Sequence, residues 1–597
     1  MRVRHDGMDV IAPSAVGLRL VGNDLGPMRL LRTTLTTSGS APDRNGPRFT
    51  ELRVDAEERA RGRRIVLRLR AYDTGAAFRL ELPHQSRLST VRLAAETTEL
   101  RFPRDYSCLA VRHSEYLNSH EGDYAPVRAS QLREGALYDL PLSCGTGRGG
   151  ETIALAESDV EHFPGAYLVK AKALGVAVRL TPLPGNASLG AIGSTPLATP
   201  WRVVMIAERP ERLIENTQVA DLAPPSRIGD ARWVRPGKAA WAWWAGLKAS
   251  GVPSAGYNNA TYRAYVDFAA RFGLPYFVID WGWAARPGGD KELADVTRFR
   301  PGVDIPALAR YAAQRHVRLW LWTNWEALGN RMEDVFALYE RWGVAGVKVD
   351  YVYRQDQVAV DYYHRLLAAA ARHHLMVNIH GAPVPRGLER TYPNLLTQEG
   401  VMGAEYNKWS RKVTSGYNVR LAYSRAVIGP MDYTPGAFSN VVPASFVARH
   451  AQPMVMTTRA QQLAMFVVYP SPLQSLCDAP SAYLDASGRP NPGAGFLRLV
   501  PATWDETRGI AGEWGRWIAV ARRSGSRWFV GVMDDDQART VPLPLGFLGH
   551  GHWRVHSIVD GRRPTDVTGY EGLVKGGGTL KVPLAVNGGA VLVFDAA

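Results

Sequence analysis

Alternating hydrophobic and polar positions dominate the first 228 residues. Residues 64–70 and 175–180 are examples, since apolar side chains recur there at every second position. Gly, Pro, Asn and Asp separate such runs. A period of two is typical of half-buried strands, so residues 1–228 are predicted to form an antiparallel β-sandwich. The Pro-containing stretch 221–226 is typical of a linker and ends this region.

The pattern changes after residue 229, where short continuous apolar runs alternate with helical segments. The predicted strands are 275–280, 317–322, 346–350 and 375–380, and the predicted helices are 262–272, 332–342 and 358–373. Repeated β–α units predict a parallel sheet, and their number favours a (β/α)8 TIM barrel over 229–503. Alternation returns in the last hundred residues, for example at 517–521, and predicts a C-terminal β-sandwich over 504–597.

Length and composition are those of a multidomain globular protein. The chain has 597 residues, of which 46% are hydrophobic and 21% charged. No run approaches the ~18–20 apolar residues that a membrane helix needs. We therefore expect no membrane insertion.

The net charge of +15, from 71 Lys and Arg against 56 Asp and Glu, raises the question of nucleic-acid binding. The basic residues are dispersed and mostly Arg, with only short clusters such as 58–64. No zinc-finger spacing, aromatic RNA-binding motif or basic helix with heptads accompanies them. We expect no nucleic-acid partner.

The three cysteines are Cys108, Cys144 and Cys477. They have no CxxC spacing, which disfavours a structural zinc site. Cys108 and Cys144 lie in the same region, and pairing between them in an oxidising compartment stays open. The first five residues lack the apolar core of a signal peptide, so we expect either a cytosolic chain or a leader outside this sequence.

Polar residues end several of the predicted barrel strands, where the chemistry of a parallel barrel is found. They are Asp280, Asn324, Asp350 and His380, followed on the next segment by Glu399 and Glu405. The aromatic residues Trp281, Trp283, Trp325 and Tyr351 come directly after. Carboxylates grip sugar hydroxyls while aromatic faces stack on sugar C–H surfaces, so these residues predict a carbohydrate site.

Hydrolysis of a glycoside needs two carboxyl groups across the scissile bond. Asp350 and Lys348 project from the same face of one strand, and a nearby cation would keep Asp350 ionised, as a nucleophile requires. The alternative is a structural Lys–Asp pair. Glu399 and Glu405 are six residues apart in a Gly-rich stretch and would repel each other, which favours a hard cation, Ca²⁺ before Mg²⁺, between them. An ordinary surface pair is the alternative.

Several motifs together resemble glycoside hydrolase family 97. They lie in family order over residues 195–525, with a further one at 13–18, and comprise 199–202, 236–244, 279–283, 346–350, 380–381, 390–394, 399–405, 432–436 and 502–507. The resemblance implies an N-terminal β-super-sandwich and a C-terminal β-sandwich flanking a catalytic (β/α)8 barrel, a catalytic calcium ion and α-glycoside substrates. Members usually begin well before the motif at 13–18, so the first sandwich edge of this chain is in question.

The family divides by mechanism at two positions. Inverting members, which are α-glucosidases, carry a Glu base where this chain has Gly381 and lack the Asp found here as Asp350. Retaining members, best known as α-galactosidases, have this Asp and this Gly. The resemblance therefore implies an exo-acting retaining α-galactosidase, with Asp350 as nucleophile and Glu405 as general acid/base.

The resemblance also implies roles around these two residues. Glu399 and Glu405 are expected calcium ligands, with Glu121 from the loop 119–124 as a third, unless it is an ordinary loop residue. Lys348 and Asp280 resemble hydroxyl-binding positions of related barrels. The remaining candidates are Trp281 and Trp283, which would pack on the sugar or belong to the core, and His380, which would bind the sugar or support its strand end.

Other functions stay open at this point. Within the family these are a β-L-arabinopyranosidase, whose sugar is galactose without its C6 group, and an α-glucosidase. A non-catalytic carbohydrate-binding protein on a decayed barrel is the alternative from another class. The expected partner is an oligosaccharide or glycoside, and the family implies a periplasmic or secreted location.

Overall fold

The computed structural model describes residues 1–22, 24–38, 48–147, 149–286 and 293–597. The chain forms two compact units. The first unit comprises 1–227, 353–365 and 383–391, and the second comprises 228–352, 366–382 and 392–597. The three-domain bounds predicted from the sequence, at 228 and 503, stay a prediction.

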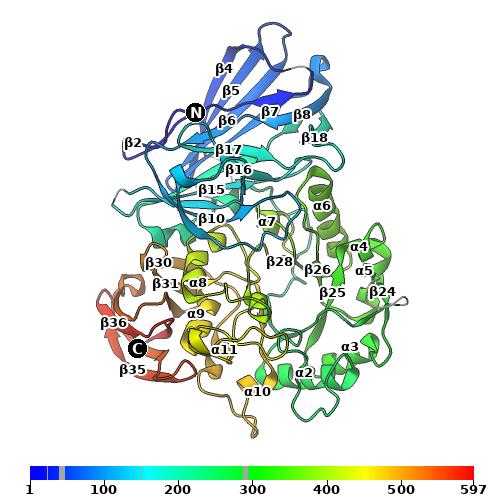
Figure 1. Ribbon diagram of the computed structural model, residues 1–597, viewed down its shortest axis with the longest axis vertical. Coiled ribbons are helices and arrows are strands. Elements are labelled where there is room, and N and C mark those ends of the chain that lie inside the picture. Colours follow the sequence, from blue (N-terminus) through cyan, green and yellow to red (C-terminus); the bar gives the residue numbers. More distant parts are fainter. Residues whose placement is uncertain (23, 39–47, 148, 287–292) are drawn as a thin grey trace. The chain divides into compact units, whose positions relative to one another are not determined.

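Antiparallel sheets make up the first unit. The largest has ten strands in the described part of the chain, in the order β12-β10-β14-β15-β20-β7-β6-β5-β4, with β19 beside β7. Its strands are β4 (Met28–Thr37), β5 (Phe49–Glu58), β6 (Arg64–Tyr72), β7 (Gly75–Leu82), β10 (Ser107–Ala110), β12 (Ala125–Arg128), β14 (Leu142–Gly145), β15 (Thr152–Ser158), β19 (Leu197–Ala198) and β20 (Trp201–Ala207). Figure 1 shows β4 to β7 side by side in blue.

Three smaller sheets complete the described part of the first unit, in the orders β11-β13-β16-β17-β9, β18-β8-β3 and β1-β2. Their strands are β1 (Val3–His5), β2 (Met8–Ile11), β3 (Leu18–Leu20), β8 (Thr90–Glu96), β9 (Glu99–Arg101), β11 (Arg112–His113), β13 (Leu137–Tyr138), β16 (Ala166–Lys170), β17 (Gly175–Leu180) and β18 (Ala191–Ser194). One short helix, α1 (Gln218–Leu222), follows. The alternating runs at 64–70 and 175–180 are strands β6 and β17, as predicted.

A disulfide joins two neighbouring strands of the largest sheet. Cys108 of β10 lies directly opposite Cys144 of β14, and their sulfur atoms are bonded. Cys477 is a buried free thiol in the second unit. The pairing left open by the sequence is therefore present in the structure.

A chain of buried charges ties the segment 383–391 to the first unit. Arg202 of β20 donates two hydrogen bonds to Glu96, at 3.0 and 2.6 Å, and another to Glu157. Nε of Arg386 donates to the other oxygen of Glu157 at 2.5 Å, and Arg386 also donates to the side chain of Gln355. Buried charges are tolerated only when paired in this way, so these contacts hold both 353–365 and 383–391 in the first unit.

Parallel strands form the barrel of the second unit. In the described residues the order is β28-β27-β26-β25-β22-β21-β29. The strands are β21 (Gly237–Trp241), β22 (Tyr276–Ile279), β25 (Arg318–Asn324), β26 (Gly346–Asp350), β27 (Met376–Ile379), β28 (Leu395–Gln398) and β29 (Leu473–Leu476). Nearly all of their residues are buried, as expected when both faces of a parallel sheet are covered.

An irregular segment takes the eighth place, between β28 and β29. The backbone N–H of Asp432 donates to the carbonyl of Gln398 at 3.1 Å, and that of Met431 donates to the carbonyl of Pro470 at 2.8 Å. The (β/α)8 fold predicted from the sequence is confirmed. One of its eight strand positions is occupied by an irregular segment.

Several of the helices after α1 have capping side chains at their N-termini. Asn258 caps the first of them by accepting from the backbone N–H of Thr261, and Gly273 ends it at φ +81°. The helices are α2 (Asn259–Phe272), α3 (Ile305–Ala313), α4 (Trp325–Leu328), α5 (Met332–Trp342), α6 (Gln357–Arg372), α7 (Leu388–Thr391), α8 (Ser415–Ala422), α9 (Arg459–Val468), α10 (Pro480–Tyr483) and α11 (Ala494–Leu499). A small hairpin, β23 (Ala284–Ala285) with β24 (Asp295–Phe299), follows β22.

The second unit ends in a β-sandwich, as predicted. One sheet has the order β30-β31-β32-β37-β34-β35, and the other pairs β33 with β36. The strands are β30 (Glu506–Glu513), β31 (Trp517–Ser524), β32 (Arg527–Asp534), β33 (Arg539–Pro544), β34 (His552–Asp560), β35 (Val567–Lys575), β36 (Thr579–Leu584) and β37 (Gly589–Ala596). Gln461 of α9 joins this sandwich to the barrel, because its side-chain amide donates to the carbonyls of Asp534 and Gly588.

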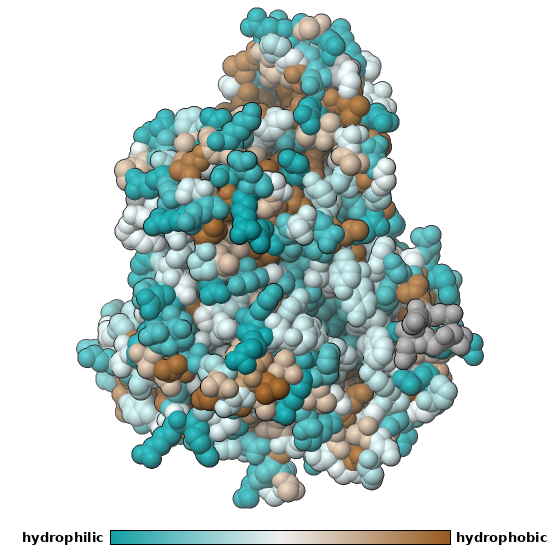
Figure 2. All heavy atoms as spheres, viewed as in Figure 1, coloured by the Kyte–Doolittle hydropathy of each residue, from teal (hydrophilic) through white to brown (hydrophobic). Residues whose placement is uncertain are grey.

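Hydrophilic side chains cover most of the visible face, with hydrophobic ones scattered among them (Figure 2). Among the described residues no helix has the length and apolar character to cross a membrane.

Candidate active site

The carboxyl ends of the barrel strands bring most of the predicted site residues together. Asp280 follows β22, Asp350 ends β26, and His380 follows β27. Glu399 follows β28, and Glu405 lies on the 3-10 helix η4 (Ala404–Lys408). Parallel strands end at the same mouth of a barrel, which is why residues far apart in sequence meet here.

Lys348 sits between two carboxylates. Its ammonium nitrogen lies 3.0 Å from Oδ2 of Asp280 and 3.3 Å from Oε1 of Glu405. Burial lowers the pKa of Lys348, but the attraction of Asp280 and Glu405 outweighs it and the pKa is raised well above its usual value. Lys348 is therefore charged. The sequence placed its charge beside Asp350, whereas its hydrogen bonds go to the two other carboxylates.

Indole and backbone donors fix the carboxylates at the strand ends. Nε1 of Trp322 donates to Oδ2 of Asp350 at 2.9 Å, and the backbone N–H of Tyr351 donates to Oδ1 at 2.7 Å. Asp280 is held likewise, by Nε1 of Trp241 at 2.8 Å and the backbone N–H of Trp281 at 2.7 Å. Both carboxylates thus have one fixed orientation.

Burial dominates the electrostatics of the two predicted catalytic carboxyls. It raises the pKa of Asp350, against the opposing charges of His380 and Lys348. It also raises the pKa of Glu405 to about 7, and the negative charge of Glu399 adds to this increase. A carboxyl that holds a proton near neutral pH can serve as a general acid.

The two residues that follow β27 hold the side chain of Glu399. Its Oε2 accepts from the backbone N–H of Gly381 at 2.7 Å, and its Oε1 lies 3.1 Å from Nδ1 of His380. Gly381 has φ +50°, in the left-handed region. Arg425, buried, donates to the backbone carbonyl of Glu399 at 2.7 Å.

Asp432 is a site residue that the sequence analysis did not single out. Its Oδ2 lies 2.6 Å from Nε2 of His380 and accepts from Nδ2 of Asn378 at 2.6 Å. His380 is thus fixed from behind with Nδ1 facing Glu399. The signal available was the motif 432–436, which contributed to the resemblance without a role being assigned to its Asp.

Three of these side chains suit a metal ion. Ligand atoms of His380, Glu399 and Glu405 lie within 4.8 Å of one another. Two carboxylates in one place favour a hard cation, because its charge offsets their repulsion. The donor set fits a calcium-like ion, although the imidazole is a softer ligand than oxygen.

Glu121, the third expected metal ligand, belongs to the first unit. It lies half-buried in the loop between β11 and β12. The preceding residue, His120, is buried, and its Nδ1 lies 2.8 Å from Asp139, whose other oxygen lies 2.7 Å from Nε2 of His113. These contacts fix the loop beside Glu121, and its role stays a prediction.

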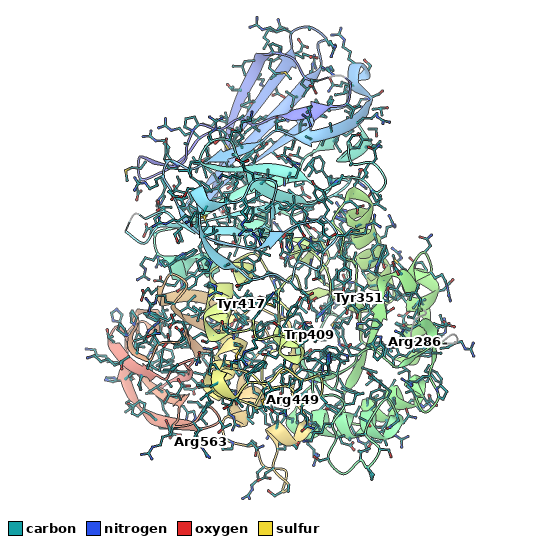
Figure 3. All side chains as sticks on the ribbon, viewed as in Figure 1. Arg286, Tyr351, Trp409, Tyr417, Arg449 and Arg563 are labelled. Atoms are coloured by element: carbon teal, nitrogen blue, oxygen red, sulfur yellow. A yellow bond between two sulfur atoms is a disulfide. The ribbon has the colours of Figure 1, made fainter. Side chains whose placement is uncertain are left out.

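The predicted aromatic contacts divide into two kinds. Trp283 is fully buried, and its indole N–H donates to the carbonyl of Trp322 at 2.8 Å, a placement that fits the core alternative. Trp281 is half-buried, with the guanidinium of Arg286 5.0 Å from its ring. Tyr351, labelled in Figure 3, is 41% exposed. Its ring meets that of Trp322 edge-on.

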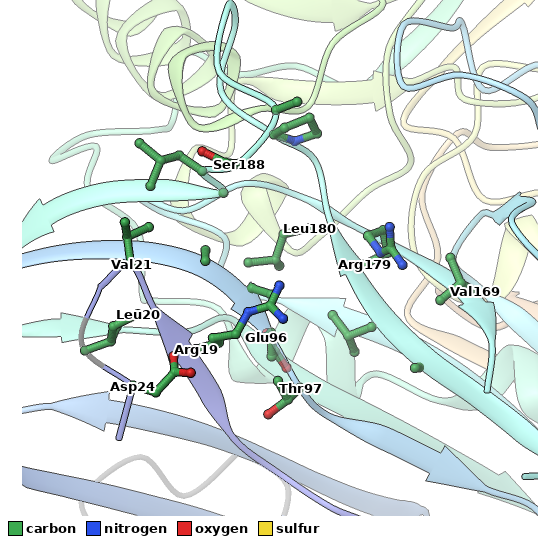
Figure 4. A pocket seen from close by; sticks show the side chains of 18 of the residues that line it. Arg19, Leu20, Val21, Asp24, Glu96, Thr97, Val169, Arg179, Leu180 and Ser188 are labelled. Atoms are coloured by element: carbon green, nitrogen blue, oxygen red, sulfur yellow. The ribbon is translucent and has the colours of Figure 1, made fainter. Parts of the chain in front are cut away.

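A cavity of about 620 Å³ lies in the first unit (Figure 4). Its charged lining includes Arg19, Arg179 and Glu96. Glu96 is already paired with Arg202. The cavity lining contains none of the predicted catalytic residues.

Comparisons with known proteins agree with this geometry. Three family models match the chain: "Glycosyl-hydrolase 97 N-terminal" at 1–225, "Glycoside hydrolase 97" at 241–401 and "Glycosyl-hydrolase 97 C-terminal, oligomerisation" at 503–595. A retaining alpha-galactosidase from Bacteroides thetaiotaomicron is 33% identical over 88% of this chain and 82% of its own length. A probable retaining alpha-galactosidase from Streptomyces bingchenggensis is 34% identical over 99% of this chain and 87% of its own.

Solved structures show the same likeness. A family 97 enzyme from Pseudoalteromonas sp. in complex with acarbose superimposes with a TM-score of 0.88, at 26% identity, over 99% of this chain and 95% of that chain.

Proposed function

Because the chain belongs to glycoside hydrolase family 97, we propose that this glycoside hydrolase is an exo-acting retaining α-galactosidase. The observation that carries the proposal is Asp350, a half-buried strand-end carboxylate with both oxygens held by donors, in a chain that has Gly381 just after the neighbouring strand β27. The two curated relatives, named as retaining α-galactosidases, support the same choice of mechanism and sugar.

The proposed reaction is a double displacement. Asp350 attacks the anomeric carbon while protonated Glu405 gives its proton to the leaving oxygen, and a covalent glycosyl–Asp350 ester forms. Glu405, now ionised, then takes a proton from water, which attacks the same carbon and releases the sugar with its α configuration. The raised pKa of Glu405 suits the first of these roles.

Neighbouring side chains would place the sugar and the proton. Lys348 and Asp280 form a buried pair whose remaining capacity suits sugar hydroxyls, and Trp281 offers a half-exposed ring beside them. His380, fixed by Asp432, faces Glu399 and Glu405 with its Nδ1. We assign these residues to substrate binding and orientation.

The metal of the proposed site is Ca²⁺, held by Glu399, Glu405 and Glu121. Bound there, it would supply positive charge and a fixed position for the carboxylate of Glu405. The approach of the first two carboxylates within 4.8 Å supports this choice. The Cys108–Cys144 disulfide supports a periplasmic or secreted location, since such bonds persist in oxidising compartments.

Proton NMR of an aryl α-D-galactoside during hydrolysis tests the mechanism. We expect α-galactose as the first anomer. We also expect Asp350→Asn to lose nearly all activity and to recover it in part with azide, which would take the place of the carboxylate and yield β-galactosyl azide. First appearance of β-galactose, or full activity of the Asn variant, would refute the assignment of Asp350.

A further inference from the structure

A series of aromatic rings leads away from the catalytic carboxylates. Trp241 donates a hydrogen bond to Asp280 through its indole N–H. Its ring stacks on that of Trp243, with ring centres 5.6 Å apart and an angle of 24° between the planes. Trp243 meets Trp409 edge-on at 6.4 Å. Trp409 in turn contacts Tyr406 at 5.3 Å and His450 at 6.0 Å. We call Trp243, Tyr406, Trp409 and His450 the ring face.

The ring face is open to solvent at its outer end. Trp409 is 45% exposed, whereas Trp241 and Trp244, which flank Trp243 in the sequence, are fully buried. Figure 3 shows Trp409 near the centre of the view. Solitary exposed apolar residues need no explanation, but clustered exposed rings beside an active site indicate a binding surface.

A buried ammonium group holds the ring face together. Nζ of Lys408 donates to the backbone carbonyls of Trp243, Trp244 and His450, at 3.1, 2.8 and 2.5 Å, and lies 4.2 Å from the ring of Trp243. Lys408 is only 4% exposed. A buried charge is costly unless its donors are satisfied, and here it fixes three chain segments in one arrangement.

The ring face lies on the turn that carries the proposed general acid. Glu405, Tyr406 and Lys408 belong to η4, and Trp409 follows immediately. The acid must reach the leaving oxygen, so the leaving group departs on the side of Glu405. We propose that the ring face binds the sugar leaving group, with the C–H surface of a pyranose ring stacked on Trp409. This inference rests on the function proposed above.

Two substrates with different leaving groups separate this role from a structural one. We would measure kcat/KM of Trp409→Ala on 6-O-α-D-galactosyl-D-glucose, whose leaving group is a sugar, and on α-D-galactosyl fluoride, whose leaving group has no ring. We expect about a tenfold loss on the disaccharide, which corresponds to ~1.4 kcal/mol of lost contact, and little change on the fluoride. Trp409→Phe keeps a ring and should restore most of the loss.

Tyr570→Ala is the matched control, because Tyr570 is a 48% exposed aromatic residue on β35 of the C-terminal sandwich. It should leave both substrates unaffected. Equal losses of Trp409→Ala on both substrates would show a structural role, and no loss on either would show no role; each result overturns the inference.

Binding can be judged without catalysis, which separates this inference from the proposed function. We expect millimolar maltose to quench the tryptophan fluorescence of the wild type and not that of Trp409→Ala. A wild type that cleaves no α-galactoside refutes the proposed function. The maltose titration then still shows whether the ring face binds a sugar. Quenching that is absent from the wild type, or equal in both proteins, would refute it.

Discussion

Replacing Trp322 by Phe removes one hydrogen bond from Asp350 and nothing else that is polar. The indole N–H of Trp322 donates to Oδ2 at 2.9 Å, and the backbone N–H of Tyr351 remains on Oδ1. A hydrogen bond to a charged group is worth ~1.5–3 kcal/mol and one to a neutral group ~0.5–1.5 kcal/mol. The carboxylate form of Asp350 therefore loses about 1–1.5 kcal/mol more than the protonated form.

This difference raises the pKa of Asp350 by about one unit, since each unit corresponds to ~1.4 kcal/mol. The proposed nucleophile acts as the carboxylate, so activity should be lost as the pH falls through this pKa. In the Phe variant the acid limb of kcat/KM should therefore lie about one pH unit higher. At pH values below the pKa of Asp350, kcat/KM of the Phe variant should be about tenfold lower than that of the wild type. At pH values above this pKa the difference should be much smaller.

Trp320→Phe is a control on the same strand. Trp320 is fully buried two residues earlier on β25, and its indole nitrogen has no hydrogen-bond partner. Both substitutions remove the same atoms from the core, but only one removes a donor to Asp350. The assay is the pH profile of kcat/KM with an aryl α-galactoside for the wild type and both variants. An unshifted limb in Trp322→Phe, or equal shifts in the two variants, would refute the reasoning.

Three further outcomes are expected. Chelation should abolish hydrolysis and lower the melting temperature, because Glu399 and Glu405 repel each other without a cation, and added Ca²⁺ should restore both properties. Full activity after exhaustive chelation would remove the metal from the proposal. Replacing Cys108 and Cys144 together by Ala should lower the free energy of unfolding by about 4 kcal/mol, because the disulfide joins residues 36 apart in sequence. Urea denaturation measures this loss, and Cys477→Ala, which removes the free thiol, is the control. Arg386→Met should cost about 3–5 kcal/mol, because Glu157 loses a buried partner, and a loss no greater than that of the exposed Arg232→Met would contradict this.

The barrel and most of its site could be predicted because both follow local patterns. Apolar runs that end in Asp280, Asp350 and His380 indicate strand ends, and parallel strands place these ends together. The two sandwiches followed from alternation in the same way. The resemblance then supplied the roles that spacing alone does not give.

What could not be predicted depends on contacts between distant segments. Asp432 lies on the irregular segment between β28 and β29, whose sequence has no strand pattern. The partners of Lys348 are on other strands, so its pairing with Asp280 and Glu405 leaves no trace in the local sequence. Trp241 and Trp322 are visible as aromatic residues, but their indole donors to carboxylates are not.

The membership of 353–365 and 383–391 in the first unit sets the order in which this chain can mature during synthesis. Glu157 is translated early, but Gln355 and Arg386, which complete its charge network, follow long after residue 227. At ~5–20 residues per second, residues 228–386 take roughly 10–30 s to emerge. Throughout that interval Glu157 is paired with Arg202 but lacks the second of its two buried cationic partners, so the first unit cannot complete this network before Arg386 is made. The segments 353–365, which includes the first part of α6, and 383–391, which includes α7, therefore mature with the N-terminal region although they are translated within the barrel sequence.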